Sequence, residues 1–279
     1  MKKISRRSFL AASGLTIAAL ALTACGGSAS TASSAASSVA ASSEAASTSA
    51  AAAELTTVEA GKLTMATNAA FPPYEMTTDA GAFEGIDIDT AQAIADKLGL
   101  ELQIDDMDFD AALLSVQQGK ADIAMAGVTV TDERKNVMDF SDSYATGIQS
   151  IIVPEGSDIA SPDDLAGKKI GTQRGTTGYI YCSDDFGDEN VVAYDDGLTA
   201  VQALNNGQVD AVVIDNAPAQ EFVAANPGLK VLDTSYAEED YAIGMAKGSA
   251  LEDAVNKALE ELKADGTLQA IVDKYINAN

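Results

Sequence analysis

The most constraining feature of this 279-residue chain is a short pattern that occurs twice. The segments Gln118 to Gly127 and Asn206 to Asp215 each contain a glycine, two further residues, an aspartate and an apolar run. A glycine behind a helical segment is typical of a helix end, because glycine adopts the left-handed conformation without strain. The repeat predicts two α/β units of similar construction, although two helix–turn–strand units can also resemble each other by chance.

Predicted strands and helices alternate along the chain. Lys62 to Thr67 and Leu100 to Ile104 have the composition of strands, and Asp89 to Leu98 carries one apolar helical face. Leu251 to Tyr275 is also helical in pattern, with a break at Gly266. This order favours an α/β fold in which each lobe is an open, mainly parallel sheet flanked by helices. Two such sheets that face each other place their strand ends around one cleft, where ligands bind.

The composition excludes several functions. The chain has 42 acidic and 17 basic residues, so nucleic acid is not an expected partner. We interpret the acidity as a source of solubility, with the steering of cations as the alternative. Because the chain has no histidine, the usual Ser-His-Asp and Cys-His arrangements and histidine-ligated zinc are absent. We expect no catalytic residues, no metal and no cofactor.

The N-terminus indicates export. Four basic residues, Lys2, Lys3, Arg6 and Arg7, precede an apolar run that is too short to span a bilayer. Leu22 to Gly27 then resembles the lipobox of bacterial lipoproteins. That resemblance implies a signal peptide at 1–24 and an acylated Cys25, for example with palmitate. A free anchor helix or a buried helix is the alternative, and Sec and twin-arginine export both stay open because of the Arg6-Arg7 pair.

Residues 25–56 comprise the predicted acylated Cys25 and a predicted disordered tether. They are almost entirely Ser, Ala, Thr and Gly, a composition that buries too little apolar surface to fold. A flexible coil of about 30 residues reaches roughly 30 Å. With Cys25 acylated, Cys182 has no partner for a disulfide, and we expect it to be a structural thiol.

The segment Ala126 to Arg134 carries the clearest binding pattern. Gly127 allows a ligand close to the backbone, and Thr129 offers a hydroxyl. Thr131 has the features of a helix N-cap, with two acidic residues behind it. Arg134 would project from that first turn, where its planar guanidinium matches a carboxylate; a plain surface arginine is the alternative.

Several motifs in the same order resemble family 3 of the bacterial solute-binding proteins, the polar amino-acid receptors of ABC importers. They are the segment Thr129 to Arg134, the following Met138 to Asp142, and Gly85 to Asp89. Thr90 departs from the family pattern, which usually has an apolar residue there. The resemblance extends from about 58 to 277 and is strongest to glutamine-binding members.

The resemblance implies a type II periplasmic-binding-protein fold with a two-crossing hinge near 144–149 and 239–244. It assigns residues 57–146 plus 243–279 to lobe 1 and residues 147–242 to lobe 2. The receptor would be a monomer, held by a lipid anchor on the extracytoplasmic face of the cell membrane, either in a periplasm or on the cell surface. It would pass its amino acid to the permease subunits of an ABC importer.

The same resemblance implies roles for individual residues. Arg134 would clamp the ligand carboxylate with help from Thr129 and Gly127, and Asp215 would accept the ligand ammonium. Phe71 and Phe109 would pack on the ligand side chain. Asn68, where receptors for cations often have a carboxylate, favours a neutral polar ligand. The complete predicted ligand-binding set is Asn68, Phe71, Phe109, Ala126, Gly127, Thr129, Arg134, Gln173, Thr176, Thr177 and Asp215.

Two other functions are open from the sequence. A dehydratase-type enzyme on the same scaffold would need a general acid in the cleft, for which Glu75 and Asp215 are the candidates. A ligand-sensing domain would need a separate partner receptor. We expect a binding protein and no enzyme, since Asp215 is better explained by the ligand ammonium.

Overall fold

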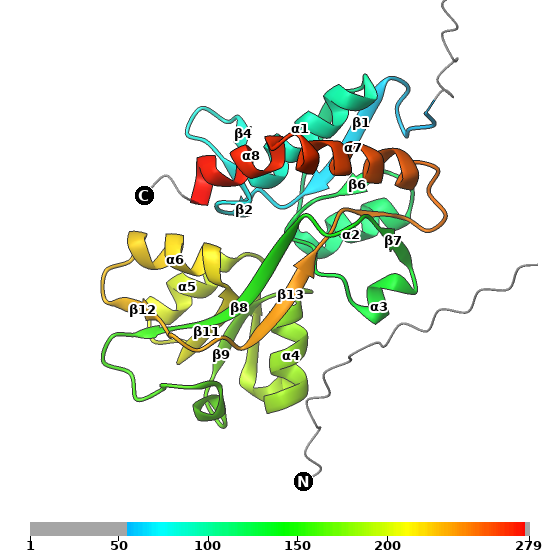
Figure 1. The fold of residues 1–279 in the computed structure, drawn as a ribbon. Helices are drawn as coiled ribbons and strands as arrows, with labels where there is room; N and C mark the ends of the chain where they lie inside the picture. The colour runs from blue at the N-terminus through cyan, green and yellow to red at the C-terminus, as the bar shows by residue number, and fades with distance from the viewer. Residues whose placement is uncertain (1–54, 277–279) are drawn as a thin grey trace, which may run out of the picture. The chain divides into compact units, whose positions relative to one another are not determined.

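The computed structural model describes residues 55–276, which form two larger sheets and one small sheet with flanking helices (Figure 1). We call the sheet of order β5-β1-β6-β14-β7, with its helices, the first lobe. The second lobe is the sheet of order β10-β9-β11-β8-β12, to which β13 adds through β8. The predicted α/β architecture is confirmed, and the predicted residue bounds of the lobes stay a prediction.

The first lobe is formed largely by the part of the chain before β8. Its strands are β1 (Lys62–Thr67), β5 (Glu101–Asp106), β6 (Ile123–Ala124), β7 (Met138–Phe140) and β14 (Gly244–Ala246). Its helices are α1 (Ile86–Leu98), α2 (Phe109–Gln117), α3 (Asp132–Lys135), α7 (Glu252–Ala264) and α8 (Thr267–Ile276). The small sheet joins β2 (Ala70–Phe71), β3 (Glu75–Thr77) and β4 (Phe83–Glu84).

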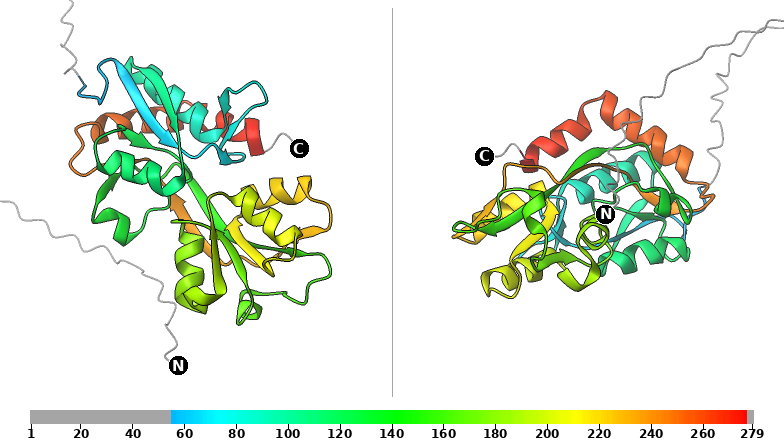
Figure 2. Two further views of the ribbon diagram at one scale, coloured as in Figure 1. Left: turned by 180° about the vertical axis from the view of Figure 1, so that it is seen from behind. Right: turned by 90° about the horizontal axis from the view of Figure 1, so that it is seen from below.

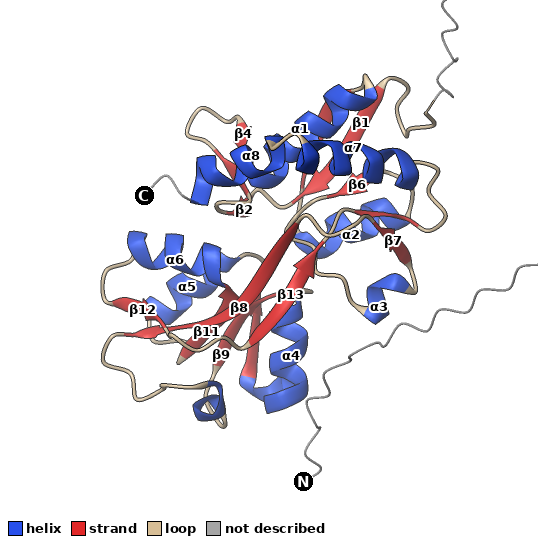
Figure 3. Ribbon diagram, viewed as in Figure 1, coloured by secondary structure: helices blue, strands red, loops and turns tan. Residues whose placement is uncertain are grey.

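The second lobe is likewise a sheet flanked by its own set of helices (Figure 3). Its strands are β8 (Ala145–Pro154), β9 (Ile170–Gln173), β10 (Val191–Tyr194), β11 (Ala211–Asp215), β12 (Leu229–Val231) and β13 (Ala237–Tyr241). Its helices are α4 (Thr177–Phe186), α5 (Gly197–Asn205), α6 (Asn216–Ala225) and the short 3-10 turns η1 (Pro162–Leu165) and η2 (Asp188–Asn190).

Each larger sheet is covered on both faces, because alternate residues of a strand point in opposite directions. In β1, Leu63 and Met65 belong to the core that includes α1 and α7, and Ala66 belongs to the core that includes α2. In β11, Val212 packs in the core with α5 and α6, and Val213 packs in the core with Cys182 of α4. Strands buried on both faces explain the continuous apolar runs in the sequence.

The twofold sequence pattern has a structural counterpart. Gly119 and Gly207 both have positive φ angles, 66° and 67°, and end their helices. In each lobe the aspartate that follows accepts a backbone N–H near the start of a neighbouring strand, β1 in the first lobe and β9 in the second. Asp122 Oδ2 accepts from Thr64 N, and Asp210 Oδ2 accepts from Lys169 N, both at 2.8 Å. The repeat therefore ties a helix end to the start of a neighbouring parallel strand of its own lobe.

The expected elements differ from the structure mainly at their ends. Strand β6 is only two residues long, and Ala126 and Gly127 directly beyond it line the cleft. Helix α1 begins at Ile86, directly after Gly85, instead of at Asp89. None of the helices within residues 55–276 combines the length and apolarity needed to cross a membrane. The predicted signal peptide, Cys25 and most of the tether lie outside the described residues.

Strands β8 and β13 run side by side between the two lobes (Figures 1 and 2). They pair antiparallel, with Gly147 opposite Glu239 and Ala145 opposite Tyr241. The end of β13 also reaches the first lobe, where Thr129 forms a bridge with Tyr241. The two segments predicted as hinge crossings are therefore neighbours, and the fully buried ring of Tyr241 packs against Gly147.

Replacing Gly147 with alanine should destabilise the fold by about 1–3 kcal/mol, the usual cost of overpacking a dense core. A Cβ at this position would lie 2.5 Å from the Tyr241 ring. Urea unfolding of the full chain measures the effect. Gly156→Ala is the control, since nothing lies within 4 Å of its added Cβ. Equal stability of the two variants would contradict the tight packing of the crossing.

Candidate functional site

The first-lobe loop that leaves β6 positions a buried arginine. Thr131 caps α3 as predicted, and its hydroxyl accepts from Arg134 N at 3.1 Å. The cap turns the Arg134 side chain inward, so that only 9% of the residue is exposed. Its guanidinium lies 5.3 Å from the centre of the Phe109 ring, a cation–π contact. Burial lowers the pKa of Arg134, but an arginine stays charged at any physiological pH.

The guanidinium of Arg134 joins the two lobes. Its Nη1 donates to the carbonyl of Thr129 in the first lobe at 2.7 Å. Its Nη2 donates to the carbonyl of Gly175 in the second lobe at 3.1 Å. Gly175 has a φ of 75°, and a Cβ there would lie 3.2 Å from Asp110 of the first lobe. A glycine at this turn lets the second-lobe loop approach the arginine closely.

The second-lobe loop ends at the start of α4. Thr176 is the N-cap of that helix, and its hydroxyl accepts from Tyr179 N at 3.3 Å. The first N–H groups of a helix have no intrahelical partner, and the helix dipole is positive there, so this end of α4 favours an anion. The hydroxyl of Thr177 points elsewhere, to the carboxylate of Glu239 at 2.9 Å.

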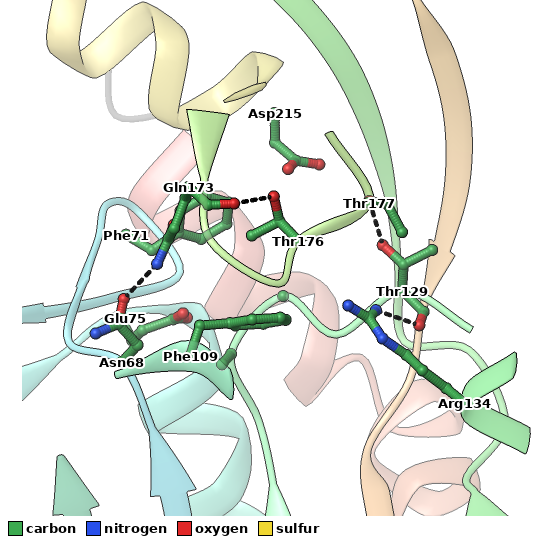
Figure 4. A pocket seen from close by; sticks show the side chains of 12 residues that line it. Asn68, Phe71, Glu75, Phe109, Thr129, Arg134, Gln173, Thr176, Thr177 and Asp215 are labelled. Atoms are coloured by element: carbon green, nitrogen blue, oxygen red, sulfur yellow. Dashed lines mark hydrogen bonds between the residues drawn. The ribbon is translucent and has the colours of Figure 1, made fainter. Parts of the chain in front are cut away.

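Asp215 supplies a buried negative group at the end of β11. One oxygen accepts from the Tyr241 hydroxyl, and the other accepts from Gln149 Nε2 at 2.8 Å. Burial raises the pKa of Asp215 to about 7, and the Tyr241 hydroxyl partly opposes that shift. The side chain comes from the second lobe, whereas Arg134 comes from the first. Figure 4 shows the two entering the pocket from different sides.

The other end of the pocket is closed by the side-chain amides of Asn68 and Gln173. Gln173 Nε2 donates to Asn68 Oδ1 at 2.8 Å, and Asn68 Nδ2 donates to the carbonyl of Met107 at 2.9 Å. Both side chains belong to the predicted ligand-binding set, and in the structure they bridge the two lobes directly (Figure 4). Phe71 and Phe109 are buried and form apolar walls beside them.

Every residue of the predicted ligand-binding set lines this one pocket. Gly127 explains part of the close packing, since its φ is 55° and a Cβ there would lie 2.9 Å from the Phe71 ring. Its N–H donates to Asp87 Oδ2 at 3.0 Å and is therefore held inside the first lobe. That these residues bind a ligand stays a prediction, since the pocket shows only that they converge.

Glu75 also lines the pocket and was not in the predicted set. It is fully buried on β3, close to the equally buried Asp87. Burial first and the negative charge of Asp87 second raise the pKa of Glu75 well above its usual range. The Pro72-Pro73-Tyr74-Glu75 turn was visible in the sequence, but only the β2–β3 pairing shows that Glu75 points inward.

Within residues 55–276, no group of three or more His, Cys, Asp or Glu side chains could hold a metal ion. Cys182 is a free, buried thiol, and burial raises its pKa to about 12. Such a thiol is a poor nucleophile, because the reactive form is the thiolate. The chemistry of the pocket is therefore that of paired charges, hydroxyls, amides and aromatic rings.

Comparison with known proteins gives the family. Residues 63–278 match the bacterial extracellular solute-binding proteins, family 3, and the chain belongs to that family. It is 33% identical over 226 residues to the L-cystine-binding protein TcyJ of Escherichia coli (strain K12), covering 79% of this chain and 85% of that protein. It is also 33% identical over 273 residues to a probable histidine-binding protein of Neisseria gonorrhoeae, covering 95% and 94% of the two chains.

The solved structures confirm the two-lobe binding-protein fold. An ancestral arginine-binding protein bound to glutamine has a TM-score of 0.74 and 43% identity, covering 77% of this chain and 98% of its own. The relatives' names refer to cystine, histidine, arginine and glutamine. The resemblance to glutamine-binding members is therefore one among several.

Lowering the pH from about 8 to about 5.5 should raise the free energy of unfolding of the protein without added ligand. Burial raises the pKa of Asp87 to about 6 and that of Asp215 to about 7. Both values exceed the value of about 3.9 expected in the unfolded chain, so the folded state binds more protons across this window. Thermal unfolding in buffers of matched ionic strength measures the trend.

Asp215→Asn is the matched variant for this titration. It removes the group with the higher of the two pKa values, so its unfolding midpoint should depend less on pH than that of the unmodified protein. A midpoint that stays constant or falls between about pH 8 and about pH 5.5 would contradict the raised pKa values.

Proposed function

We propose that this protein is an extracytoplasmic, lipid-anchored receptor that binds a polar amino acid between its lobes and delivers it to an ABC importer. The observation that carries the proposal is the pair of buried opposite charges, Arg134 in the first lobe and Asp215 in the second. An amino acid carries an anion and a cation a fixed distance apart. A pocket with a guanidinium from one lobe and a carboxyl group from the other is complementary to that backbone.

The division of these groups between lobes supplies a reason for closure. The ligand carboxylate would be held by Arg134 and the start of α4, and the ligand ammonium by Asp215. Since neither lobe satisfies both ends alone, the ligand has a higher affinity for the closed arrangement than for an open one. That difference in affinity is what allows a ligand to drive a conformational change. The closed form is the one that the permease would recognise.

The side-chain end of the pocket favours a polar ligand. Phe71 and Phe109 pack on the aliphatic part, and the Asn68–Gln173 pair with Glu75 forms the polar end. In its protonated form Glu75 would donate a hydrogen bond to a neutral side chain, whereas a cationic side chain would favour its ionised form. The preference for a neutral polar amino acid, based on Asn68, stays part of the proposal.

An enzyme remains the second candidate because of one observation. Glu75 is a buried carboxyl with a raised pKa that lines the pocket, and these are properties of a general acid. The raised pKa of Glu75 has structural causes, burial first and the neighbouring Asp87 second, and so does not require catalysis. Turnover of a prephenate-type substrate by the purified protein would establish the enzyme and overturn the receptor proposal.

A thermal-shift screen of the full chain against the common amino acids tests the proposal directly. At a concentration a hundred times its dissociation constant, a true ligand should stabilise the protein by about 2.7 kcal/mol. Arg134→Ala should weaken the binding of that ligand by about 2–5 kcal/mol, because the ligand carboxylate loses its buried partner. Calorimetric titration measures the loss.

Arg174→Ala is the matched control for Arg134→Ala. Arg174 lies on the adjacent second-lobe loop, and its side chain is 53% exposed. This variant should bind with unchanged affinity. No stabilisation by any amino acid, or an Arg134→Ala variant that binds as well as the control, would refute the proposed function.

Cys25→Ser should release the protein from the membrane fraction. A bilayer holds a protein stably through two acyl chains, and the lipobox cysteine is the proposed site of acylation. Fractionation of cells that express each variant measures the distribution. Cys182→Ala should stay with the membranes, since Cys182 is buried inside the fold. Membrane retention of Cys25→Ser would contradict the lipid anchor.

A further inference from the structure

Glu239 is a buried carboxylate that no part of the proposed amino-acid site uses. It lies on β13, opposite Gly147 of β8, at the crossing between the lobes. Only 6% of the residue is exposed, whereas its neighbours Glu238 and Asp240 are exposed. Burying a carboxylate is costly unless hydrogen bonds or a charge compensate it. The contacts of Glu239 therefore indicate what it does.

Three donors converge on one oxygen of Glu239. Thr129 Oγ1 of the first lobe donates at 3.1 Å, and Thr177 Oγ1 of the second lobe donates at 2.9 Å. Gln149 Nε2, on the crossing strand β8, donates at 3.0 Å. The two threonine hydroxyls are 3.5 Å apart, so a single carboxylate oxygen joins both lobes at their contact. Moving the lobes apart would break at least one of these bonds.

The charge of Glu239 is also balanced across the lobes. The guanidinium of Arg134 is attracted to it, and this attraction opposes the effect of burial on the arginine. The amide of Gln149 donates to both Glu239 and Asp215, which keeps the two carboxylates in fixed positions. Both lobes and the crossing strand β8 therefore supply donors to Oε2 of Glu239, whereas Oε1 is buried without a hydrogen-bond partner among the described residues.

The hydrogen bonds also set the direction of both hydroxyls. A threonine hydroxyl has one proton and two lone pairs. When the protons of Thr129 and Thr177 point to Glu239, the hydroxyls offer lone pairs to other neighbours. Both threonines line the pocket, so they present acceptors there and not donors. Acceptors suit the N–H groups of an ammonium better than the oxygens of a carboxylate, so this arrangement favours a contact of Thr129 with the ligand ammonium over the carboxylate contact that the family resemblance implies.

We propose that Glu239 is a positioning residue that links the lobes in the closed form and orients the hydroxyls of Thr129 and Thr177 as acceptors in the cleft. It acts through the threonines and does not contact the ligand. Because part of the closed arrangement is then stabilised before an amino acid arrives, the ligand spends less of its binding free energy on closure. This inference rests on the proposed function for its effect on affinity, but not for its effect on closure.

The test compares Glu239→Gln with Glu238→Gln in the full chain. Both substitutions remove one negative charge from β13, and only the first changes the buried contacts. Hydrogen–deuterium exchange without added ligand should be faster in Glu239→Gln within the two cleft loops, 126–134 and 173–179. Exchange in α7 should not change. Calorimetric titration with L-arginine, L-glutamine and L-cystine should show about tenfold or greater weakening for whichever of them the unmodified protein binds.

Substitutions of Thr177 provide a second, independent test. Thr177→Val removes the hydroxyl and should speed exchange in both cleft loops, whereas Thr177→Ser keeps it and should leave the exchange of these loops without ligand as in the unmodified protein. Glu239→Gln should add little to Thr177→Val, since two changes that break the same contact are not additive. A residue that only stabilised the fold would instead change exchange in α7 as well.

The outcomes separate the two proposals. If Glu239→Gln matches Glu238→Gln in exchange and affinity, or if Thr177→Val leaves the cleft loops unchanged, the role of Glu239 is refuted. If the unmodified protein binds none of the three amino acids, the result counts against the proposed function, and exchange in the cleft loops still decides whether Glu239 links the lobes.

Discussion

The burial of Arg134 is the constraint on which the rest of the cleft depends. A guanidinium in the interior needs partners for its N–H groups, and two of them are backbone carbonyls from different lobes. Both carbonyls must approach to about hydrogen-bond distance, which requires the tight turn at Gly175 and the capped start of α3. The aromatic ring of Phe109 then covers the face of the guanidinium. One charge therefore determines the conformation of both loops.

The fold meets this constraint through its repeated plan. In each lobe the glycine–aspartate unit fixes a helix end against a neighbouring parallel strand, β1 or β9, so the loops beyond the strands start from a rigid edge. The first lobe contributes the arginine and the second contributes Asp215. The crossing strands β8 and β13 add Gln149 and Glu239 between them. Both lobes and the crossing strands thus form the cleft. Hydrogen bonds between its polar groups join the lobes and would break if the lobes moved apart.

Much of this site could be predicted from local sequence. Thr131 followed by two acidic residues is a complete helix N-cap signal, although the same spacing also fits a surface arginine and so does not by itself predict the burial of Arg134. The glycine–aspartate repeat likewise predicts where each strand begins. These features depend on neighbours a few residues apart, which a sequence displays directly.

The remaining contacts depend on distant pairing. Glu239 lies in an acidic run that is typical of a solvent-exposed strand, and only its register against β8 turns it inward. The Asn68–Gln173 pair joins residues from two lobes, so neither position shows its partner. Glu75 was noticed in its turn, but its proximity to Asp87 arises from the small sheet packing on α1. Tertiary register decides these positions, and no short window of sequence contains it.

The central claim is that opposite charges on the two lobes recognise the backbone of an amino acid. Its most direct test is a calorimetric comparison of the bound amino acid with two analogues, its α-carboxamide and its α-hydroxy acid. Each analogue keeps the side chain and loses one backbone charge. The account predicts that both bind at least about thirtyfold more weakly, because each leaves Arg134 or Asp215 without its partner. Binding of either analogue with the affinity of the amino acid would contradict it.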